Sequence, residues 1–567
     1  MYKWLFVIVF IAFLFRVPNI TQIPVGFTPD EASFGYDAYS LLLTGRDQWG
    51  RAFPLVLESF GDFKAPLYTY LTVPFVWIFG LTKFAVRLPN ALIGVAAVLA
   101  TYFLTSELLN LNKYVKQKFT DINAVLPTLA SLFVAISPWH IMMSRGAFEA
   151  NLTTFFLPLG VFLFLKGLRL KSSPNMLLAS IFLGLNLFSY HAARLVTPLI
   201  GISLVILFFG SLRNMGWKKL TPAIFFVLLF STLVGVTFYQ GAGRRASDVS
   251  IANGALEAQA DARLLAINSG QSPVVARLLH NKYIVIADRF LDNYKSYWSI
   301  DFLIKNGPRE ATYGMIPGIG VMSVLEGILL LFFVVAVIAR RNQKAYLFII
   351  FWLLVGFLPA SLTTGVGHAA NRAEVILPAL PIALAFGMGF FLTVITKFNL
   401  SRKKVWFGFA LVVCVFVNAV NTIYDYYKDS PVKSAKAMLY GNLEAAGVLS
   451  KHAASDIVVS RSLSEPHIYI AFSHVWDPAD YQKHTLSWQS YKELGLSFLD
   501  QLPTYSLGKY TFRSINNPDN PESTPELVLG RPEEFALGIR PVETFYYPDG
   551  SLALYIVNTK QNKYASR

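Results

Sequence analysis

An adjacent pair of acidic residues, Asp30 and Glu31, lies between Gly26 and Tyr70, just after the first apolar stretch of the chain. An exposed carboxylate in this position is suited to take a proton from a substrate hydroxyl as a general base. The pair is equally suited to cap a short helix over 32–43, because free N–H groups and the helix dipole favour carboxylates at a helix N-terminus. Both interpretations depend on the membrane context.

Other polar side chains with chemical potential recur in short segments between apolar stretches. The candidate substrate-binding residues are Lys64, Arg145, Glu149, Tyr190, His191, Arg194, His368 and Arg372. Arg145 and Glu149 are four residues apart, so on one helix they would form an ion pair. Long basic chains often extend from an apolar segment to the membrane surface. Their recurrence in short segments favours an anionic ligand instead, such as a lipid phosphate.

Metal ligands show no such pattern. The histidines His140, His191, His280 and His368 are not spaced as a metal site, so we assign no metal ligand and no certain cofactor, and leave a divalent metal open. The single cysteine, Cys414, excludes a disulfide within the chain and a cysteine-based metal site.

The composition is that of a membrane protein. Of 567 residues, 54% are hydrophobic and 15% are charged, against about 25% charged in soluble chains. The net charge of +15 lies in short loops beside apolar segments, which indicates topology and not nucleic-acid binding. We find no nucleotide-binding motif. Residues 4–15 resemble a signal-peptide core without a following cleavage site, so we expect a retained first span.

Twelve apolar stretches have near membrane-spanning length. They are 4–19, 66–81, 88–109, 123–142, 152–166, 176–190, 195–211, 220–239, 316–339, 344–362, 374–396 and 405–424. The second is short and contains two prolines. If it lies on the outer surface as an interfacial helix and the N-terminus is cytoplasmic, every basic cluster becomes cytoplasmic. Those clusters are Lys113, Lys116 and Lys118; Lys166, Arg169 and Lys171; Arg213, Lys218 and Lys219; Arg340, Arg341 and Lys344; and Lys397, Arg402, Lys403 and Lys404.

The sequence therefore predicts a polytopic α-helical membrane protein with about eleven transmembrane helices in the cell (plasma or inner) membrane. The transmembrane domain spans 1–424, with outer loops at 20–87 and 240–315. Residues 425–567 form an extracytoplasmic α/β or α+β domain. We expect strands at Ile457–Val459, Ile468–Phe472 and Leu552–Val557, and helices near Ser434–Lys451 and Tyr491–Leu502.

An outward-facing carboxylate beside a cationic, lipid-accessible surface suits transfer of a group from a lipid phosphate to a hydroxyl. The carboxylate would accept the proton of the hydroxyl. Arginine and lysine would stabilise the departing phosphate. A single displacement would invert the anomeric carbon, by analogy with inverting glycoside chemistry.

The order of several motifs resembles the GT-C superfamily of integral-membrane glycosyltransferases. The motifs are Asp30-Glu31 with Gly35–Tyr39, Thr44–Asp47 with Gly50, Lys64–Tyr68, Phe84–Pro89, Ser137-Pro138 with Ser144, Arg145 and Glu149, Asn371-Arg372 before Leu377-Pro378, and Tyr426–Gly441. The resemblance covers about residues 1–445. It is strongest to bacterial relatives of the protein O-mannosyltransferases and to the lipid A aminoarabinose transferases.

The resemblance implies a polyprenyl- or dolichyl-phosphate monosaccharide donor and an inverting mechanism. It implies that Asp30 is the catalytic aspartate and that Glu31 supports it or binds the acceptor. The chain departs from the aminoarabinose transferases at Asp62-Phe63-Lys64, where Phe63 separates the acid from the lysine and Ala65 separates the lysine from Pro66.

We therefore predict an inverting glycosyltransferase that acts on the outer face of the membrane, in protein glycosylation or in building a cell-envelope glycan. Asp30 and Glu31 would be catalytic, with Glu31, Arg145 and Glu149 around the sugar and acceptor, and Lys64, Arg194 and Arg372 at the phosphate. The acceptor would be a glycan, lipid or protein. The alternatives are an oligosaccharyltransferase or glycan ligase that uses a lipid pyrophosphate and, less favoured, a transporter or flippase.

Overall fold

The computed structural model describes residues 2–111, 120–243, 249–309, 311–313, 315–316, 318–364, 370–397, 404–515 and 525–562. Six of the described helices are long and apolar enough to cross a membrane, or eight if each of two bent helix pairs is one span. The chain is thus a multi-pass membrane protein. The expected number of about eleven spans is not confirmed, since several apolar stretches form helices too short for this criterion.

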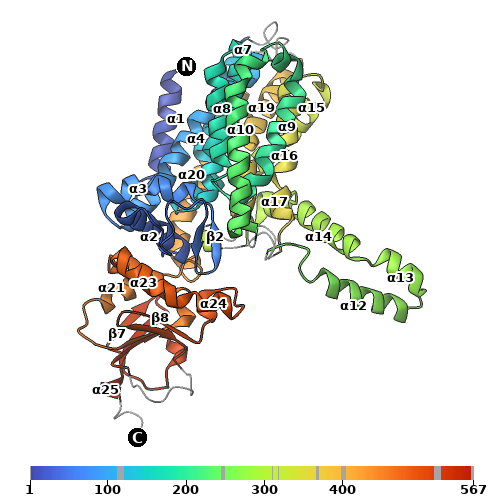
Figure 1. Cartoon of the computed structure of the whole chain (residues 1–567). Helices are drawn as coiled ribbons and strands as arrows, with labels where there is room; N and C mark the ends of the chain where they lie inside the picture. The colour runs from blue at the N-terminus through green and yellow to red at the C-terminus, as the bar shows by residue number, and fades with distance from the viewer. Residues whose placement is uncertain are drawn as a thin grey trace.

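The helical bundle occupies the upper part of Figure 1. Its main helices are α1 (Tyr2–Arg16), α4 (Lys83–Leu111), α5 (Thr120–Ile136), α6 (Pro138–Arg145), α7 (Thr153–Leu170), α8 (Ser173–Asn186), α9 (His191–Arg213), α10 (Trp217–Thr237), α15 (Val324–Ala339), α16 (Lys344–Gly356), α19 (Ala379–Lys397) and α20 (Lys404–Lys433). Shorter turns of helix are η2 (Glu149–Leu152), α17 (Leu358–Ser361), α18 (Ala370–Ala373) and η6 (Glu374–Ile376).

The first loop folds into a compact unit at one end of the bundle. It contains α2 (Pro29–Thr44), the antiparallel hairpin β1 (Leu57–Ser59) and β2 (Asp62–Lys64), and α3 (Leu67–Phe79). Helix α2 begins with a capping box, in which the Thr28 side chain accepts from the Glu31 N–H and the Glu31 side chain accepts from the Thr28 N–H. The capping role considered for this acidic pair is therefore confirmed for Glu31. Helix α3 corresponds to the segment expected to be interfacial.

The second long loop extends from the side of the bundle as an arm of three helices (Figure 1). These are α12 (Ala255–Asn268), α13 (Pro273–Leu279) and α14 (Lys282–Tyr297). One π-helix, η3 (Phe238–Ala242), precedes the arm, and another, η4 (Asp301–Lys305), follows it.

The C-terminal region contains a six-stranded mixed sheet in the order β4-β5-β3-β6-β8-β7. Its elements are α21 (Asn442–Leu449), β3 (Ile457–Ser460), α22 (Pro466–Ser473), α23 (Pro478–Trp488), α24 (Ser490–Glu493), η8 (Leu499–Gln501), β4 (Thr504–Leu507), β5 (Tyr510–Arg513), β6 (Leu527–Gly530), β7 (Glu543–Tyr546), β8 (Leu552–Asn558) and α25 (Thr559–Asn562). Strand β3 is parallel to β5 and β6, and the other pairs are antiparallel.

Two of the three expected strands are present, as β3 and β8, but the third prediction is wrong. Residues Ile468–Phe472 belong to helix α22, which Pro466 starts and whose residues Pro466–Phe472 are all buried. A helix buried on all sides has a continuous apolar sequence, which periodicity cannot distinguish from a buried strand. The expected helix Ser434–Lys451 is shorter as α21, and only the turns α24 and η8 form in Tyr491–Leu502. The proposed domain boundary at 424/425 falls inside α20.

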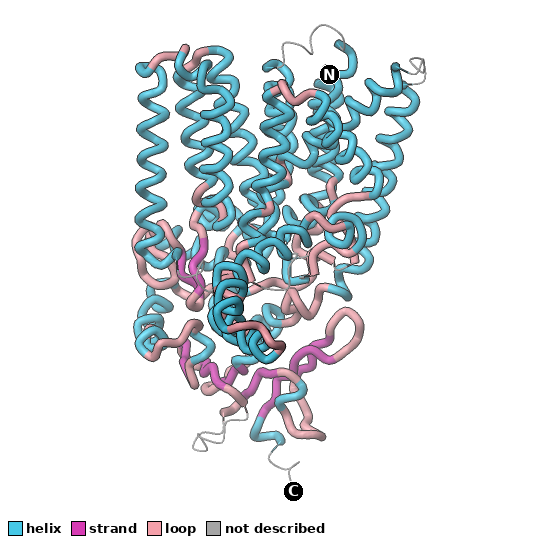
Figure 2. Tube along the Cα trace, turned by 90° about the vertical axis from the view of Figure 1, so that its right-hand side faces the viewer, coloured by secondary structure: helices cyan, strands magenta, loops and turns pink. Residues whose placement is uncertain are grey.

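The N-terminus and the C-terminal sheet lie at opposite ends of the molecule (Figures 1 and 2). The first-loop unit lies between the bundle and the sheet (Figure 1). Two glycines allow very close contact there. A Cβ on Gly26 would lie 2.3 Å from the Met438 carbonyl oxygen, and one on Gly61 would lie 2.2 Å from the Ser497 carbonyl oxygen. Both have positive φ, which only glycine adopts readily.

Candidate active site

Asp30 forms an ion pair with Lys64, whose Nζ lies 2.7 Å from the Asp30 Oδ1. Asp30 is in the first turn of α2, and Lys64 is the last residue of β2. The Asp30 side chain is 46% exposed, whereas that of Lys64 is 3% exposed. The lysine ammonium also lies over the rings of Phe34 and Phe60, at 4.7 and 5.0 Å from their centroids. The carboxylate is therefore accessible and sits beside a fixed positive charge.

The hairpin that carries Lys64 is held by the C-terminal region. Glu58 on β1 is buried and accepts a 2.7 Å hydrogen bond from the Tyr491 hydroxyl. The same carboxylate forms ion pairs with Lys492, at 2.6 Å, and with Arg51. Burial would raise the pKa of the Glu58 carboxyl, but the bonds from Lys492 and Tyr491 and the charge of Arg51 outweigh it and lower the pKa. The first loop and the C-terminal region therefore both hold the hairpin that positions Lys64.

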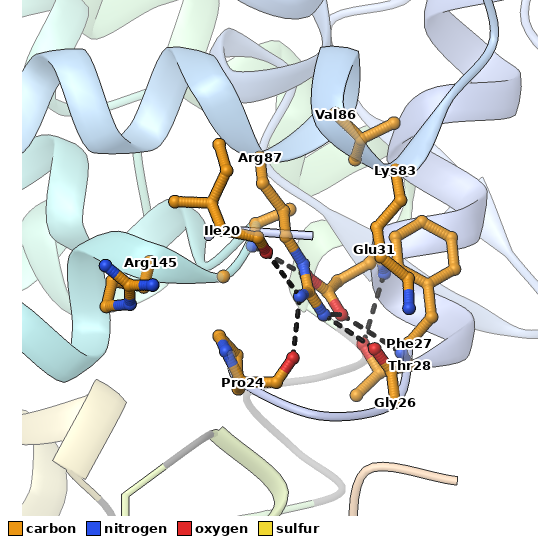
Figure 3. A network of polar contacts seen from close by, with 12 residues as sticks. Ile20, Pro24, Gly26, Phe27, Thr28, Glu31, Lys83, Val86, Arg87 and Arg145 are labelled. Carbon is orange, nitrogen blue, oxygen red and sulfur yellow. Dashed lines mark hydrogen bonds and ion pairs between the residues drawn. The ribbon is translucent and has the colours of Figure 1, made fainter. Parts of the chain in front are cut away.

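Glu31 has a different environment, shown in Figure 3. It forms a bidentate ion pair with Arg87 of α4, with N–O distances of 2.7 and 2.8 Å, and neither side chain is exposed. Its Oε1 also accepts from the Ala147 N–H at 2.9 Å. Burial would raise the pKa of the Glu31 carboxyl, but Arg87 and the N–H donors of Ala147 and Thr28 hold it below its ordinary value. Glu31 therefore joins α2, α4 and the segment after α6.

Two buried arginines also bind the chain that leads into α2. Arg87 donates to the carbonyls of Ile20, Pro24 and Gly26, each at 2.8 Å (Figure 3). Arg145 donates to the carbonyls of Phe15, Pro18 and Ile23, at 2.8, 2.7 and 3.1 Å. Apart from Phe15, which is in the last turn of α1, the carbonyls bound in this way belong to the connection between α1 and α2, so these two arginines hold the segment that leads to Asp30.

The structure thus corrects part of the prediction for Arg145. Helix α6 ends at Arg145, and Glu149 begins the separate turn η2, so the two residues do not share a helix. The Arg145 guanidinium is buried and faces backbone carbonyls and the Tyr427 ring, 4.9 Å away, rather than open space beside Asp30. Its position is explained by the folding of the first loop.

Residues predicted at the start of α9 lie beside the hairpin. His191 Nε2 donates a 2.8 Å hydrogen bond to the carbonyl of Phe63, the residue before Lys64. Arg194 lies one turn further, with its Nη1 3.5 Å from the His191 Nδ1 and its guanidinium 5.7 Å from the Phe238 ring centroid. The buried Nη2 of Arg194 has no hydrogen-bond partner in the described part of the chain. Tyr190, buried at the N-cap, contacts the His191 ring.

One further carboxylate lies near Asp30, and another lies near that one. Glu149 interacts electrostatically with both Asp30 and Lys64. Glu374, in η6, interacts in turn with Glu149. Glu374 is fully buried, and neither of its carboxylate oxygens has a hydrogen-bond partner among the described residues. A proton or a positively charged group would offset the cost of this burial.

The late turn is only partly described. Arg372, in α18, donates a 2.9 Å hydrogen bond to the Thr364 carbonyl. His368 lies outside the described residues, as do the basic clusters at Lys113–Lys118 and Arg402-Lys403. Within the described residues, the late turn is linked to Glu149 through the charge of Glu374.

Three potential metal ligands lie close together in the C-terminal region. The ligand atoms of Glu465, His467 and Asp500 are within 4.8 Å of one another, and this is the one such group in the described part of the chain. The side chains of two of the histidines considered earlier have other partners. His140 contacts Arg16 and Thr154, and His191 contacts Phe63.

Sequence analysis missed Arg87, Glu374 and Glu465 as site-associated residues. Arg87 is part of a quoted motif, but its partner Glu31 is 56 residues away, and no local pattern joins them. Glu374 could have been identified from the sequence. It is an acid at the start of an apolar stretch, and such a residue is a functional candidate in a membrane protein.

No protein-family model matches the chain. No curated protein matches its sequence either. Two solved structures of ArnT from Cupriavidus metallidurans are similar in fold. The form bound to undecaprenyl phosphate has a TM-score of 0.53 at 12% identity, covering 98% of this chain and 97% of ArnT. The apo form has a TM-score of 0.51 at 11% identity, covering 98% of both chains.

A third solved structure is the archaeal oligosaccharyltransferase AglB from Archaeoglobus fulgidus, in complex with an inhibitory peptide and a dolichol-phosphate. Its TM-score is 0.47 at 13% identity, and the match covers 83% of this chain but only 63% of AglB. The likeness to ArnT extends over nearly the whole of both chains, including the C-terminal sheet. This chain therefore has the fold of ArnT.

Proposed function

We propose that this protein is an inverting glycosyltransferase that moves a monosaccharide from a polyprenyl-phosphate donor to a hydroxyl acceptor. The reaction would occur at the end of the bundle that carries the first loop and the C-terminal sheet. The observation that carries the proposal is the half-exposed Asp30 carboxylate, ion-paired with a buried lysine at the end of a fixed hairpin. The ArnT fold supports the donor class, because one of its structures holds undecaprenyl phosphate.

In this proposal Asp30 is the general base. Its exposed face accepts the proton of the acceptor hydroxyl as that oxygen attacks the anomeric carbon and the bond from that carbon to the phosphate oxygen breaks. Lys64 has two roles: it pairs with the Asp30 carboxylate, and its positive charge would stabilise negative charge on the departing phosphate.

Arg194 is the second cation proposed for the lipid phosphate. Its Nη2 lacks a hydrogen-bond partner in the described part of the chain, and a phosphate oxygen would satisfy it. His191 ties this arginine to the Lys64 hairpin through the Phe63 carbonyl. Arg372 and His368 remain predicted phosphate or substrate contacts from the late turn, and Tyr190 a predicted contact at the start of α9.

In this proposal Glu31 is a positioning residue for Asp30. With both oxygens bound to Arg87 and to backbone N–H groups, it orients the first turn of α2 and with it Asp30. Glu149, which interacts with Asp30 and Lys64, is the proposed contact to the sugar or acceptor. Arg145 is proposed to position the loop.

The test uses purified full-length protein with radiolabelled undecaprenyl-phosphate mannose, glucose and galactose, and a solubilised cell-envelope fraction as acceptor. Release of undecaprenyl phosphate and transfer of label to the envelope fraction are measured for wild type and Asp30→Asn. We expect transfer from one of these donors and a loss of about 10²–10⁴-fold in the variant, the range for removal of a general base.

Asp261→Asn is the matched control, because Asp261 is exposed on the arm helix α12. It should transfer label at the wild-type rate. Equal rates for Asp30→Asn and wild type would refute the role of Asp30. Transfer only from a pyrophosphate-linked glycan, supplied in a parallel reaction, would replace the proposed donor class with that of a glycan ligase.

A further inference from the structure

The segment that enters helix α22 brings an acidic residue of the C-terminal region to the Asp30–Lys64 pair. Glu465 lies 401 positions after Lys64 in the sequence, yet its carboxylate interacts electrostatically with both Lys64 and Asp30. The Phe60 ring connects the two regions, because it contacts the Lys64 ammonium, 5.0 Å from its centroid, and the His467 ring, 5.8 Å between centroids. The two parts of the chain are therefore in direct contact at this point.

The backbone around Glu465 is held in a conformation that its side chain does not favour. Ser464 and Glu465 have φ values of 56° and 54°, in the left-handed region that non-glycine residues rarely enter. Such strain persists only where the surrounding structure enforces it, and it is concentrated at functional sites. Here the enforcing contacts are a 2.7 Å hydrogen bond from the Glu465 N–H to Asp500 Oδ2 and another, of 2.6 Å, from the Tyr505 hydroxyl to Asp500 Oδ1.

The Glu465 carboxylate has an unsatisfied oxygen. The side chain is nearly fully buried, and its Oε2 has no hydrogen-bond partner among the described residues; His467 Nδ1, at 3.9 Å, is beyond hydrogen-bond distance. His467 Nδ1 is already bonded to the Tyr505 hydroxyl at 3.0 Å. A buried carboxylate oxygen without a donor is costly, which indicates that a donor from outside the chain completes it.

We propose that Glu465 is a substrate-binding residue of the active site, which accepts a hydrogen bond from a hydroxyl of the bound substrate beside Asp30. This inference rests on the proposed glycosyl transfer. Its ligand chemistry is a hydroxyl, supplied either by the acceptor or by the donor sugar. The C-terminal region thereby completes the site instead of serving only as an attached domain.

Burial raises the pKa of the Glu465 carboxyl well above its ordinary value, and the nearby Asp500 adds to the effect while Lys64 opposes it. A hydroxyl ligand suits either protonation state, because a hydroxyl both donates and accepts hydrogen bonds.

The test compares Glu465→Gln with Glu493→Gln, whose residue is exposed on α24 of the same region. Initial rates are measured while the labelled undecaprenyl-phosphate sugar is varied at fixed envelope fraction, and then while the envelope fraction is varied. We expect Glu465→Gln to raise the half-saturating concentration of one substrate at least tenfold, with a smaller change in kcat. A rise for the envelope fraction assigns the hydroxyl to the acceptor, and a rise for the lipid donor assigns it to the sugar.

The control variant should match wild type in both series. Tyr505→Phe, which removes the hydroxyl that holds Asp500, should shift the same half-saturating concentration in the same direction by a smaller factor. Unchanged half-saturation for both substrates in Glu465→Gln, with active wild type, overturns the inference alone. A wild type that transfers no sugar overturns the proposed function and this inference with it.

Metal content gives a readout independent of activity. Stoichiometric zinc or manganese in the purified wild type, lost in Glu465→Gln and kept in Glu493→Gln, would make Glu465 a metal ligand with His467 and Asp500 and would overturn the hydroxyl-binding role. We expect equal metal content in all three proteins. Melting temperatures within a few degrees of wild type show that the folded state is intact.

Discussion

Asp30 and Glu31 are neighbours in the first turn of α2, and each is paired with a cation. The two ion pairs differ in geometry, in burial and in access to solvent. The Glu31–Arg87 pair is bidentate and wholly buried, and further N–H and carbonyl groups complete both partners. In the Asp30–Lys64 pair the lysine is buried and the aspartate is 46% exposed. The buried pair has no free face for a substrate, so it builds the loop, whereas the half-exposed pair has both charge and access.

The largest expected effect comes from breaking the buried pair. Glu31→Gln or Arg87→Gln leaves one buried charge without its partner, which typically costs about 3–5 kcal/mol. The free energy of unfolding of each single variant should fall by this amount. The double variant should lose less than the sum of the two, because it buries no uncompensated charge. Tryptophan fluorescence during thermal or denaturant unfolding in detergent measures all four proteins of this cycle.

Asp30→Asn is the contrasting substitution in that series. Because water reaches the Asp30 side chain, its free energy of unfolding should change by less than that of Glu31→Gln, although its activity falls further. A larger loss of stability in Asp30→Asn than in Glu31→Gln would contradict the division of roles between the two ion pairs.

A smaller effect is expected from the cation of the half-exposed pair. Lys64→Met keeps a long apolar side chain between Phe34 and Phe60 but removes the charge near the departing phosphate. Removing one preorganised donor to developing negative charge costs about 10²–10³-fold in kcat. The affinity for undecaprenyl phosphate, measured by its inhibition of transfer, should fall as well.

Lys492→Met is the matched control for this substitution. Lys492 pairs with Glu58 of the same hairpin, at 2.6 Å, so its loss should lower stability and leave inhibition by undecaprenyl phosphate nearly unchanged. If both lysine variants lost affinity for the lipid to the same extent, hairpin position and not the Lys64 charge would account for the result.

Local patterns in the sequence were enough to predict Asp30 and Lys64 as site residues, but only Glu31 of the buried pair with Arg87. The helix start at Thr28 to Glu31 follows from residue types at fixed spacing, and the apolar stretches follow from membrane thickness. Arg87, Glu374 and Glu465 reach the site only through tertiary packing, across separations that no short-range rule covers. Arg145 was predicted to bind substrate because of its charge. In the structure its guanidinium instead donates to the carbonyls of Phe15, Pro18 and Ile23.

A pH-dependent effect is expected from a third acid of α2, Asp37, which is buried and has no cation bonded to it in the described part of the chain. Burial raises its pKa to about 8, and repulsion from Asp47 adds to the shift, while bonds from the Gln48 N–H and side-chain amide oppose it. The folded state therefore keeps a proton that the unfolded state loses above about pH 4. Stability should fall as pH rises from about 4 to 8, by about 1.4 kcal/mol per pH unit for this group.

Asp37→Asn should flatten that dependence, because an amide keeps an acceptor for the Gln48 N–H and does not titrate. Melting temperatures from pH 5 to pH 8 measure the slope for wild type, for Asp37→Asn and for the exposed control Asp261→Asn. A slope that survives in Asp37→Asn but not in Asp47→Asn would place the proton on Asp47, whose pKa is raised to about 6. Loss of the slope in Asp37→Asn would separate the three acids of α2: Glu31 charged and satisfied by Arg87, Asp30 paired and partly exposed, and Asp37 buried with its proton. Only Asp30 among them combines a nearby positive charge with access, which is what a general base at a lipid-phosphate site requires.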